Sequence, residues 1–295
     1  MTIKHLVISG GGPILLQIIA TIQYLEANNI FNLSDIQSIY GTSAGSIIGV
    51  FICLHFDWET LNDYLIKRPW QEVFQLKAQN IFESYNNKGI FDIKTIEKCF
   101  KPLFDAKDIP IDINLNDFYE LTKIELHFFS FEMNEYKMED ISYITYPKLS
   151  LIKAVQMSCC VPLLFTPVFI ENKCFIDGGI SCNYPLNYCI ESGKNSDEIF
   201  GFKKIFINRN NTNSINTNST IIDFVLYFLY RAVFNINKDS LHSEIKNEIS
   251  YDMNVLSVDL FHTCLSSTEY RKELFNKGTE LAVEYVTKLK LQNSI

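Results

Sequence analysis

The chain has 295 residues, of which 47% are hydrophobic and 20% charged, and its formal net charge is −8. This size and composition suit one globular domain over residues 1–295, and the acidic balance argues against non-specific binding to nucleic acid. The eight cysteines form no C-x-x-C pair, no secretory leader precedes the first strand pattern, and no apolar run reaches the length of a membrane span. We therefore expect reduced thiols and a cytoplasmic protein.

The beginning of the chain alternates between strand and helix patterns. The hydrophobic spacing predicts a strand over 3–9, a helix from Leu15 to Asn28-Asn29, a strand over 35–40 and a helix over 44–55. A glycine-rich turn joins the first pair, and a tight turn joins the second pair. This order predicts an α/β fold with a parallel sheet.

The rest of the chain continues with mixed patterns. Residues 58–104 are mostly helical and aromatic in pattern, and the later expected elements are a strand over 126–133, a helix over 149–157, a strand pair within 168–176, strands over 204–208 and 254–260, and an amphipathic helix over 268–290. Residues 208–220 are polar and low in complexity, which predicts a flexible, Asn-rich exposed loop.

A serine lies on the tight turn between the second expected strand and its helix. Gly41-Thr42-Ser43-Ala44-Gly45 fits G-x-S-x-G, where flanking glycines relieve crowding around a strained nucleophile. Ser43 then stands at a helix N-terminus, where the helix dipole favours negative charge. The pattern predicts Ser43 as a nucleophile supported by Gly41 and Gly45, and a simple turn is the alternative.

Three consecutive glycines, Gly10, Gly11 and Gly12, follow the first expected strand. Glycines let the backbone approach a ligand closely and direct N–H groups into a pocket. Each such donor stabilises the oxyanion of a tetrahedral intermediate by about 3 kcal/mol. A dinucleotide-binding loop requires another glycine where this chain has Leu15. We therefore predict an oxyanion hole at Gly10, Gly11 and Gly12, with a flexible turn as the alternative.

A nucleophilic serine needs a base. The five histidines lie in no recognisable motif: His5, His55, His127, His242 and His262. His262 follows an expected strand late in the chain, where an α/β-hydrolase places its triad histidine. Asp177 ends an apolar run and precedes Gly178-Gly179, and partial burial would raise its pKa from about 3.9 so that it can accept the serine proton. We prefer Asp177 as the base, and a structural Asp-Gly-Gly turn is the alternative.

The apolar segment over 221–234 contains only Asp223 and Arg231 as charged residues. A buried core helix has this signature, and so does an interfacial helix or lid that contacts a lipid surface. We favour the core helix.

Four blocks in this order resemble the patatin-like phospholipases. The glycine triplet is similar to the oxyanion loop of the family, and Gly41–Gly45 to its nucleophile elbow. The segment that contains Ser158 and Pro162 resembles a third block, and Asp177-Gly178-Gly179 resembles the catalytic aspartate block. A closing helix around Gly278 extends the resemblance over nearly the whole chain.

The resemblance implies a three-layer α/β/α patatin-like fold with a mainly parallel central sheet. It also implies a Ser–Asp dyad without histidine, in which Ser43 is the nucleophile, Asp177 is the base and Gly10, Gly11 and Gly12 surround the oxyanion. The implied reaction is hydrolysis of phospholipid or other glycerolipid acyl esters through an acyl-serine, of the phospholipase A or lysophospholipase type. The implied chemistry requires no metal or cofactor, and a lipid substrate implies peripheral membrane contact.

The glycine loop departs from the family pattern at Pro13, Ile14 and Leu15. The family commonly carries Lys or Arg at the place of Ile14 and a fourth glycine at the place of Leu15. Loss of this cation would weaken the stabilisation of negative charge or shift head-group preference. Two alternatives stay open. One is an acyltransferase or general esterase with the same dyad, and the other is a catalytically weak patatin-like protein that binds membranes or a partner.

Overall fold

A computed structural model describes residues 2–206, 215–236, 243–253 and 257–292. Its centre is an eight-stranded sheet with the order β10-β9-β1-β2-β4-β8-β7, and β5 pairs with β4. The strands are β1 (His5–Ile8), β2 (Ser38–Thr42), β4 (Glu125–Glu132), β5 (Lys137–Ile141), β7 (Val168–Ile170), β8 (Lys173–Asp177), β9 (Ile199–Phe206) and β10 (Glu248–Met253). Neighbouring strands from β10 to β4 are parallel, whereas the pairs that involve β5, β7 and β8 are antiparallel.

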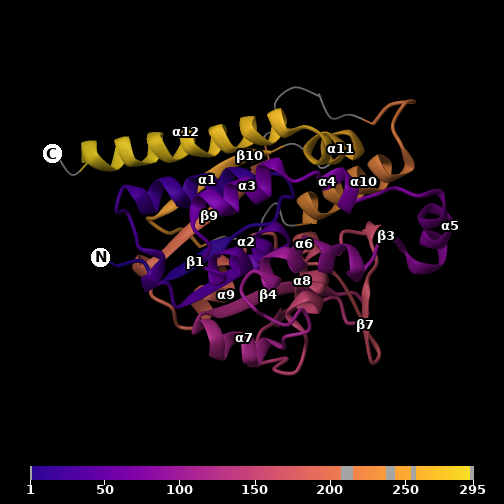
Figure 1. Cartoon of the computed structure of the whole chain (residues 1–295), viewed down its shortest axis with the longest axis horizontal. Coiled ribbons are helices and arrows are strands. Elements are labelled where there is room, and N and C mark those ends of the chain that lie inside the picture. Colours follow the sequence, from indigo (N-terminus) through magenta and orange to yellow (C-terminus); the bar gives the residue numbers. More distant parts are fainter. Residues whose placement is uncertain (1, 207–214, 237–242, 254–256, 293–295) are drawn as a thin grey trace.

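Helices surround this mainly parallel sheet (Figure 1). They are α1 (Ile14–Ala27), α2 (Ala44–Cys53), α3 (Trp58–Lys67), α4 (Trp70–Val73), α5 (Ala78–Asn87), α6 (Ile93–Asp105), α7 (Leu115–Thr122), α8 (Leu151–Cys159), α9 (Leu186–Glu191), α10 (Ile221–Ile236), α11 (Val258–Ser266) and α12 (Thr268–Gln292). A separate parallel pair joins β3 (Gly89–Phe91) to β6 (Leu163–Phe165).

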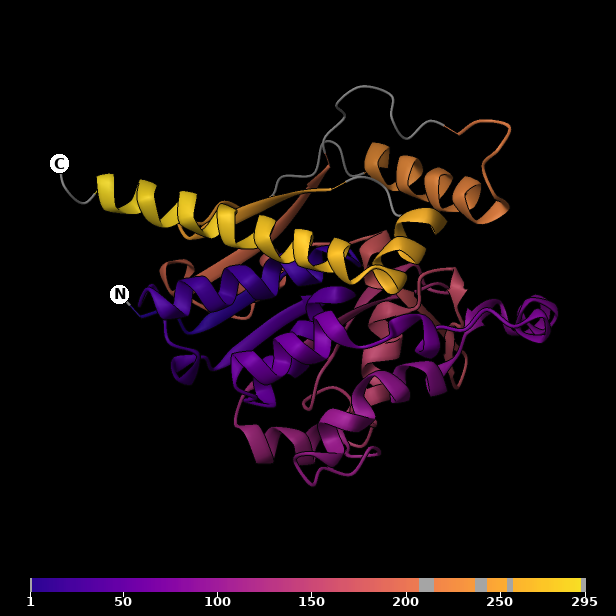
Figure 2. The same cartoon turned by 45° about the horizontal axis from the view of Figure 1, so that its top comes forward.

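The two faces of the sheet bury alternate residues of each strand. In β1, Leu6 and Ile8 join the large core that includes side chains of α1, α2, α8 and α12, whereas Val7 joins a smaller cluster with Leu186 and Cys189 of α9. Figures 1 and 2 show α12 running along α1 on the outside of the large core. Helices on both faces give three layers, which confirms the α/β fold class and the mainly parallel sheet.

The expected elements of the first half are confirmed with shifted ends, and the largest differences lie near the C-terminus. Strand β9 begins at Ile199, before the expected start at Lys204. The expected strand over 254–260 is wrong at its end, because Val258 to Leu260 begin α11, where Ser257 Oγ accepts the Leu260 N–H at 3.1 Å. Residues 254–256 and most of the expected Asn-rich loop lie outside the described residues.

Helix α10 lies on the surface, although we favoured a core helix there. Phe224 is 52% exposed and Phe228 is 62% exposed, whereas Leu226 is buried. The helix therefore presents an apolar face outward. None of the helices in the described part of the chain has the length and apolar character needed to cross a bilayer.

Candidate active site

Ser43 stands on a strained turn between β2 and α2. Its backbone has φ 53° and ψ −119°, a conformation that costs a residue with a side chain about 1–3 kcal/mol. The first turn of α2 packs so closely on β1 that a Cβ on Gly45 would lie 2.2 Å from the Ile8 carbonyl oxygen. Gly41 is the last residue but one of β2, on the other side of the serine. Strand and helix together hold the Ser43 backbone in this conformation.

A buried serine supports the turn from behind. Ser158, in the last turn of α8, accepts the Ser43 N–H at 2.9 Å and donates to the Phe129 carbonyl oxygen at 2.8 Å. Ser158 is fully buried. It therefore ties the position of Ser43 to β4 and α8. The sequence placed Ser158 in a family block but gave no role for its hydroxyl.

The glycine loop lies against the nucleophile. An ideal Cβ on Gly10 would lie 2.9 Å from Ser43 Cβ, so only glycine allows this approach. The Gly10 N–H donates to the Asn183 carbonyl oxygen at 3.1 Å, and Asn183 Nδ2 donates back to the Gly10 carbonyl oxygen at 3.1 Å. The Gly11 and Gly12 N–H groups donate to no acceptor among the described residues. Gly10 thus allows the close approach to Ser43, and Gly11 and Gly12 carry the available N–H donors.

Asp177 ends β8 beside this loop and is 5% exposed. Its Oδ1 accepts the Gly179 N–H at 2.7 Å, while its buried Oδ2 has no hydrogen-bond partner in the described part of the molecule. Burial raises the Asp177 pKa to about 6, and the Ser43 hydroxyl, the Gly179 N–H and the Lys204 charge partly offset this rise. The Ser43 hydroxyl lowers the Asp177 pKa, although Oδ2 accepts no hydrogen bond from it. In active sites, such hydrogen bonds often form only when substrate binds.

An apolar cavity of about 230 Å³ opens on the other side of Ser43. Ser43 and Gly12 line it together with side chains such as Ile47 of α2, Val155 of α8 and Leu164 of β6. Phe261 and Leu265 of α11 add to the wall. The cavity therefore places an apolar volume beside Ser43.

Arg271 is the charged residue in the cavity wall, and it is almost completely buried. Its guanidinium donates to the carbonyl oxygens of Ile66, Arg68, Cys264 and Leu265 and to Thr268 Oγ1. Burial lowers its pKa. These bonds join α3, α11 and α12, so Arg271 serves to hold the cavity wall together.

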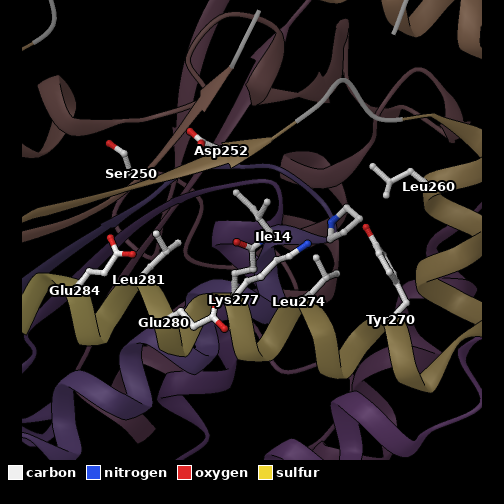
Figure 3. Close-up of a pocket in the computed structure, with 12 residues that line it drawn as sticks. Ile14, Ser250, Asp252, Leu260, Tyr270, Leu274, Lys277, Glu280, Leu281 and Glu284 are labelled. Carbon is white, nitrogen blue, oxygen red and sulfur yellow. The ribbon is translucent and has the colours of Figure 1, made fainter. Parts of the chain in front are cut away.

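A second cavity of about 420 Å³ lies behind the glycine loop (Figure 3). Lys277, Leu274 and Leu281 of α12 and Ile14 of α1 point into it in Figure 3, with Ser250 and Asp252 of β10 on its far side. Pro13 lines both cavities. Neither Ser43 nor Asp177 lines the second cavity.

The histidines lie away from Ser43 in the described residues. His5 Nδ1 bonds to Ser38 Oγ at 2.8 Å, and His127 Nδ1 bonds to Asp140 Oδ2 at 2.7 Å. His55 follows α2, His262 is exposed on α11, and His242 lies outside the described residues. None of the four described histidines lines the apolar cavity. The described ranges also contain no group of three or more His, Cys, Asp or Glu suited to a metal ion.

Comparison with known families decides what this arrangement belongs to. A sequence model of the patatin-like phospholipases matches residues 6–190, more than half of the chain, and this range contains both Ser43 and Asp177. The chain belongs to the patatin-like phospholipase family. In this patatin-like chain, the matched range ends before β9, β10 and the helices α10 to α12.

Similar proteins extend over more of the chain. The probable lipid hydrolase 463L of Invertebrate iridescent virus 6 is 23% identical over 95% of this chain and 87% of its own length. The uncharacterized protein R571 of Acanthamoeba polyphaga mimivirus is 22% identical over 97% of this chain and 95% of its own length. The crystal structure of VipD from Legionella pneumophila matches with a TM-score of 0.50 and 14% identity, over 95% of this chain and 67% of VipD. At this identity, VipD shows a shared fold alone.

Proposed function

We propose that this patatin-like chain hydrolyses the acyl esters of phospholipids or other glycerolipids through an acyl-serine on Ser43. The observation that carries the proposal is the position of Ser43, between the buried carboxyl of Asp177 and an apolar cavity. A long-chain acyl ester matches these surroundings, because its apolar tail ends at a polar ester group. The name of the viral relative 463L, a probable lipid hydrolase, supports this choice of substrate.

The proposed reaction has two steps. Asp177 accepts the Ser43 Oγ proton while Oγ attacks the ester carbonyl carbon, and the N–H groups of Gly11 and Gly12 bind the resulting oxyanion. The intermediate collapses, the Asp177 proton passes to the leaving alkoxide, and Ser43 keeps the acyl group. Water then attacks the acyl-serine with Asp177 again as base, which releases the fatty acid and restores Ser43.

The raised pKa of Asp177 suits this role. A carboxyl with a pKa of about 6 is largely ionised at neutral pH, yet it binds a proton more readily than an exposed aspartate does. The free energy of proton transfer from the serine hydroxyl to Asp177 therefore becomes less unfavourable. Gly178 and Gly179 belong to the turn η2 (Gly178–Ile180), whose backbone positions the carboxyl through the bond from Gly179 to Oδ1.

We also propose that one end of the molecule contacts the lipid surface. Five aromatic side chains are exposed there and define the aromatic end surface: Phe82 and Tyr85 of α5, Phe169 of β7, and Phe224 and Phe228 of α10. Both views of the molecule place α5 and α10 at the same end (Figures 1 and 2). Along the chain, α5 lies between Phe74 and β3. Phe74 and Phe165 line the apolar cavity. Exposed aromatic side chains suit shallow insertion into a membrane interface.

The dyad is tested with Ser43→Ala and Asp177→Asn in the full chain. We expect wild type to release fatty acid from phosphatidylcholine vesicles, lysophospholipid or short esters, and each variant to lose about a thousandfold or more in kcat. A fluorophosphonate probe should label wild type and leave Ser43→Ala unlabelled. Ser34→Ala and Asp105→Asn make the same chemical changes at exposed positions and should keep full activity.

Three results would contradict the proposal. The first is a folded wild type that cleaves none of these esters, and the second is full activity in either dyad variant. The third is acyl transfer to an added alcohol in place of fatty-acid release, which would favour an acyltransferase with the same dyad. Circular dichroism and thermal melting of each variant show whether a loss of activity reflects unfolding.

A further inference from the structure

Lys204 reaches the glycine loop from a strand that lies beyond the family match. Strand β9 pairs in parallel with β1, so its C-terminal end lies beside the start of the loop. The Lys204 N–H donates to Ser9 Oγ at 2.8 Å, and the Ser9 N–H donates to the Phe202 carbonyl oxygen at 3.0 Å. These two bonds fix the Lys204 backbone next to Gly10.

The Lys204 side chain runs along Gly11. An ideal Cβ on Gly11 would lie 3.1 Å from Lys204 Cδ and 2.5 Å from Ile14 Cδ1, so Gly11 is closely packed between the two side chains. Pro13, Ile14 and Leu15 continue the loop without any charged side chain. Lys204 is therefore a cation that the fold brings to this loop from another strand.

Lys204 and Asp177 act on each other electrostatically. Burial lowers the Lys204 pKa to about 8, and the Asp177 carboxylate opposes this shift. Lys204 in turn lowers the pKa of Asp177, which burial raises to about 6. The thiols of Cys159 and Cys160 also interact electrostatically with Asp177, but burial raises their pKa values well above the usual range, so they stay neutral. Both Lys204 and Asp177 are charged between these two pKa values.

We infer that Lys204 supplies the positive charge of the oxyanion loop and acts as a positioning residue for the proposed hydrolysis. Before attack, its ammonium keeps Asp177 ionised. During attack, the proton of Ser43 neutralises Asp177 while negative charge forms on the oxyanion beside Gly11 and Gly12. A cation that lies against Gly11 and acts on Asp177 stays near the negative charge in both states. This inference rests on the proposed function, because it concerns the same reaction.

The test is the pH dependence of kcat/KM on a soluble short ester from pH 5 to 10. Wild type should show a bell, with an acidic limb from Asp177 near pH 6 and a basic limb from Lys204 near pH 8. Lys204→Gln should lose about tenfold at pH 7, lose the basic limb and shift the acidic limb to higher pH. Lys204→Arg should keep most of the activity and lose the basic limb, because a guanidinium stays charged.

The matched control is Lys203→Gln. Lys203 is the preceding residue of β9, and its Nζ lies 3.6 Å from Glu248 Oε1. This variant should keep both limbs and the wild-type rate. A merely structural role for Lys204 would lower the melting temperature or kcat of Lys204→Gln without moving either limb, and that result would overturn the inference.

Two further results separate this inference from the proposed function. An active wild type with an inactive Ser43→Ala, combined with a Lys204→Gln variant identical to wild type, rejects Lys204 alone. An active Ser43→Ala rejects the hydrolytic dyad itself. The rate of fluorophosphonate labelling of Ser43 against pH gives a second measurement on every variant that melts cooperatively. An unshifted acidic limb of labelling in Lys204→Gln also overturns the inference.

Discussion

The two sides of Ser43 are made of different residues and come from different parts of the chain. On the polar side, Asp177, Asn183 and Lys204 come from the ends of strands or from loops that follow them. On the apolar side, the cavity wall is made of side chains from helices as far apart in sequence as α2 and α11. In the proposed reaction, the polar side provides proton transfer and charge, whereas the apolar side provides volume for an acyl chain.

The same contrast applies to stability. Apolar side chains around the cavity stabilise the fold because they leave water. The polar side removes a carboxyl and an ammonium from water, and the pKa shifts of Asp177 and Lys204 both reflect this desolvation. The difference teaches that the polar side lowers the stability of the fold, which the proposed chemistry explains. Substitutions on the two sides should therefore have opposite consequences.

The largest expected effect on stability is a gain from Asp177→Asn. Burial raises the Asp177 pKa from 3.8 to about 6, so folding favours the neutral carboxyl and stability is lost as pH rises through that range. At about 1.4 kcal/mol per pKa unit, the ionised carboxylate costs about 3 kcal/mol. Urea unfolding should show the variant more stable than wild type by about this amount at pH 8 and equal to it below pH 4.

The control for this prediction is Asp105→Asn, at an exposed carboxylate that pairs with Lys101 on the surface of α6. Its free energy of unfolding should differ little from wild type at any pH, because exposed ion pairs contribute little. A variant Asp177→Asn that is less stable than wild type at pH 8 would show that the carboxylate serves the fold, which would remove the contrast between the two sides.

The sequence revealed much of the polar side because its residues occur in short local patterns. Ser43 and its glycines, the triplet at Gly10–Gly12 and the turn after Asp177 each combine a strand end with glycines. The parallel strands β1 and β2 bring the glycine triplet and Ser43 to one edge of the sheet. Strand β8 is antiparallel to β4, and it places Asp177 at this edge because Asp177 pairs with Ser130 near the end of β4. Lys204 has no such pattern, because only the pairing of β9 with β1 places it at Gly11.

The apolar side was beyond prediction because it depends on how distant helices pack. Phe261 of α11 packs on Phe74 and Phe91, which are far away in sequence. The sequence even suggested a strand over 254–260, since Val255, Val258 and Leu260 are apolar. The N-cap at Ser257, with Asp259 in the first turn, was a helix signal that could have corrected the start of α11.

A smaller effect is expected from partly filling the cavity with Leu164→Trp. The indole occupies volume that an acyl chain would fill, and displacing about two methylene groups costs about 1.5 kcal/mol or roughly tenfold in binding. The kcat/KM for long-chain esters should fall about tenfold relative to that for butyryl esters. Leu281→Trp makes the same change in the second cavity (Figure 3) and should leave chain-length preference unchanged. An equal effect of both variants would reject the cavity beside Ser43 as the acyl site.

The smallest effect is expected at the aromatic end surface. Phe82 of α5 is 81% exposed, so Phe82→Ser removes apolar area without opening a cavity in the core. If this ring is partly inserted into the membrane, its removal should make vesicle binding about fivefold weaker. Hydrolysis of a soluble short ester should stay at the wild-type rate. Leu121→Ser makes a comparable change at an exposed apolar residue of α7, which lies away from α5 in Figure 1. If both variants bind vesicles as wild type does, Phe82 makes no contact with lipid, and the apolar character around Ser43 ends at the cavity without extending to the outside of the molecule.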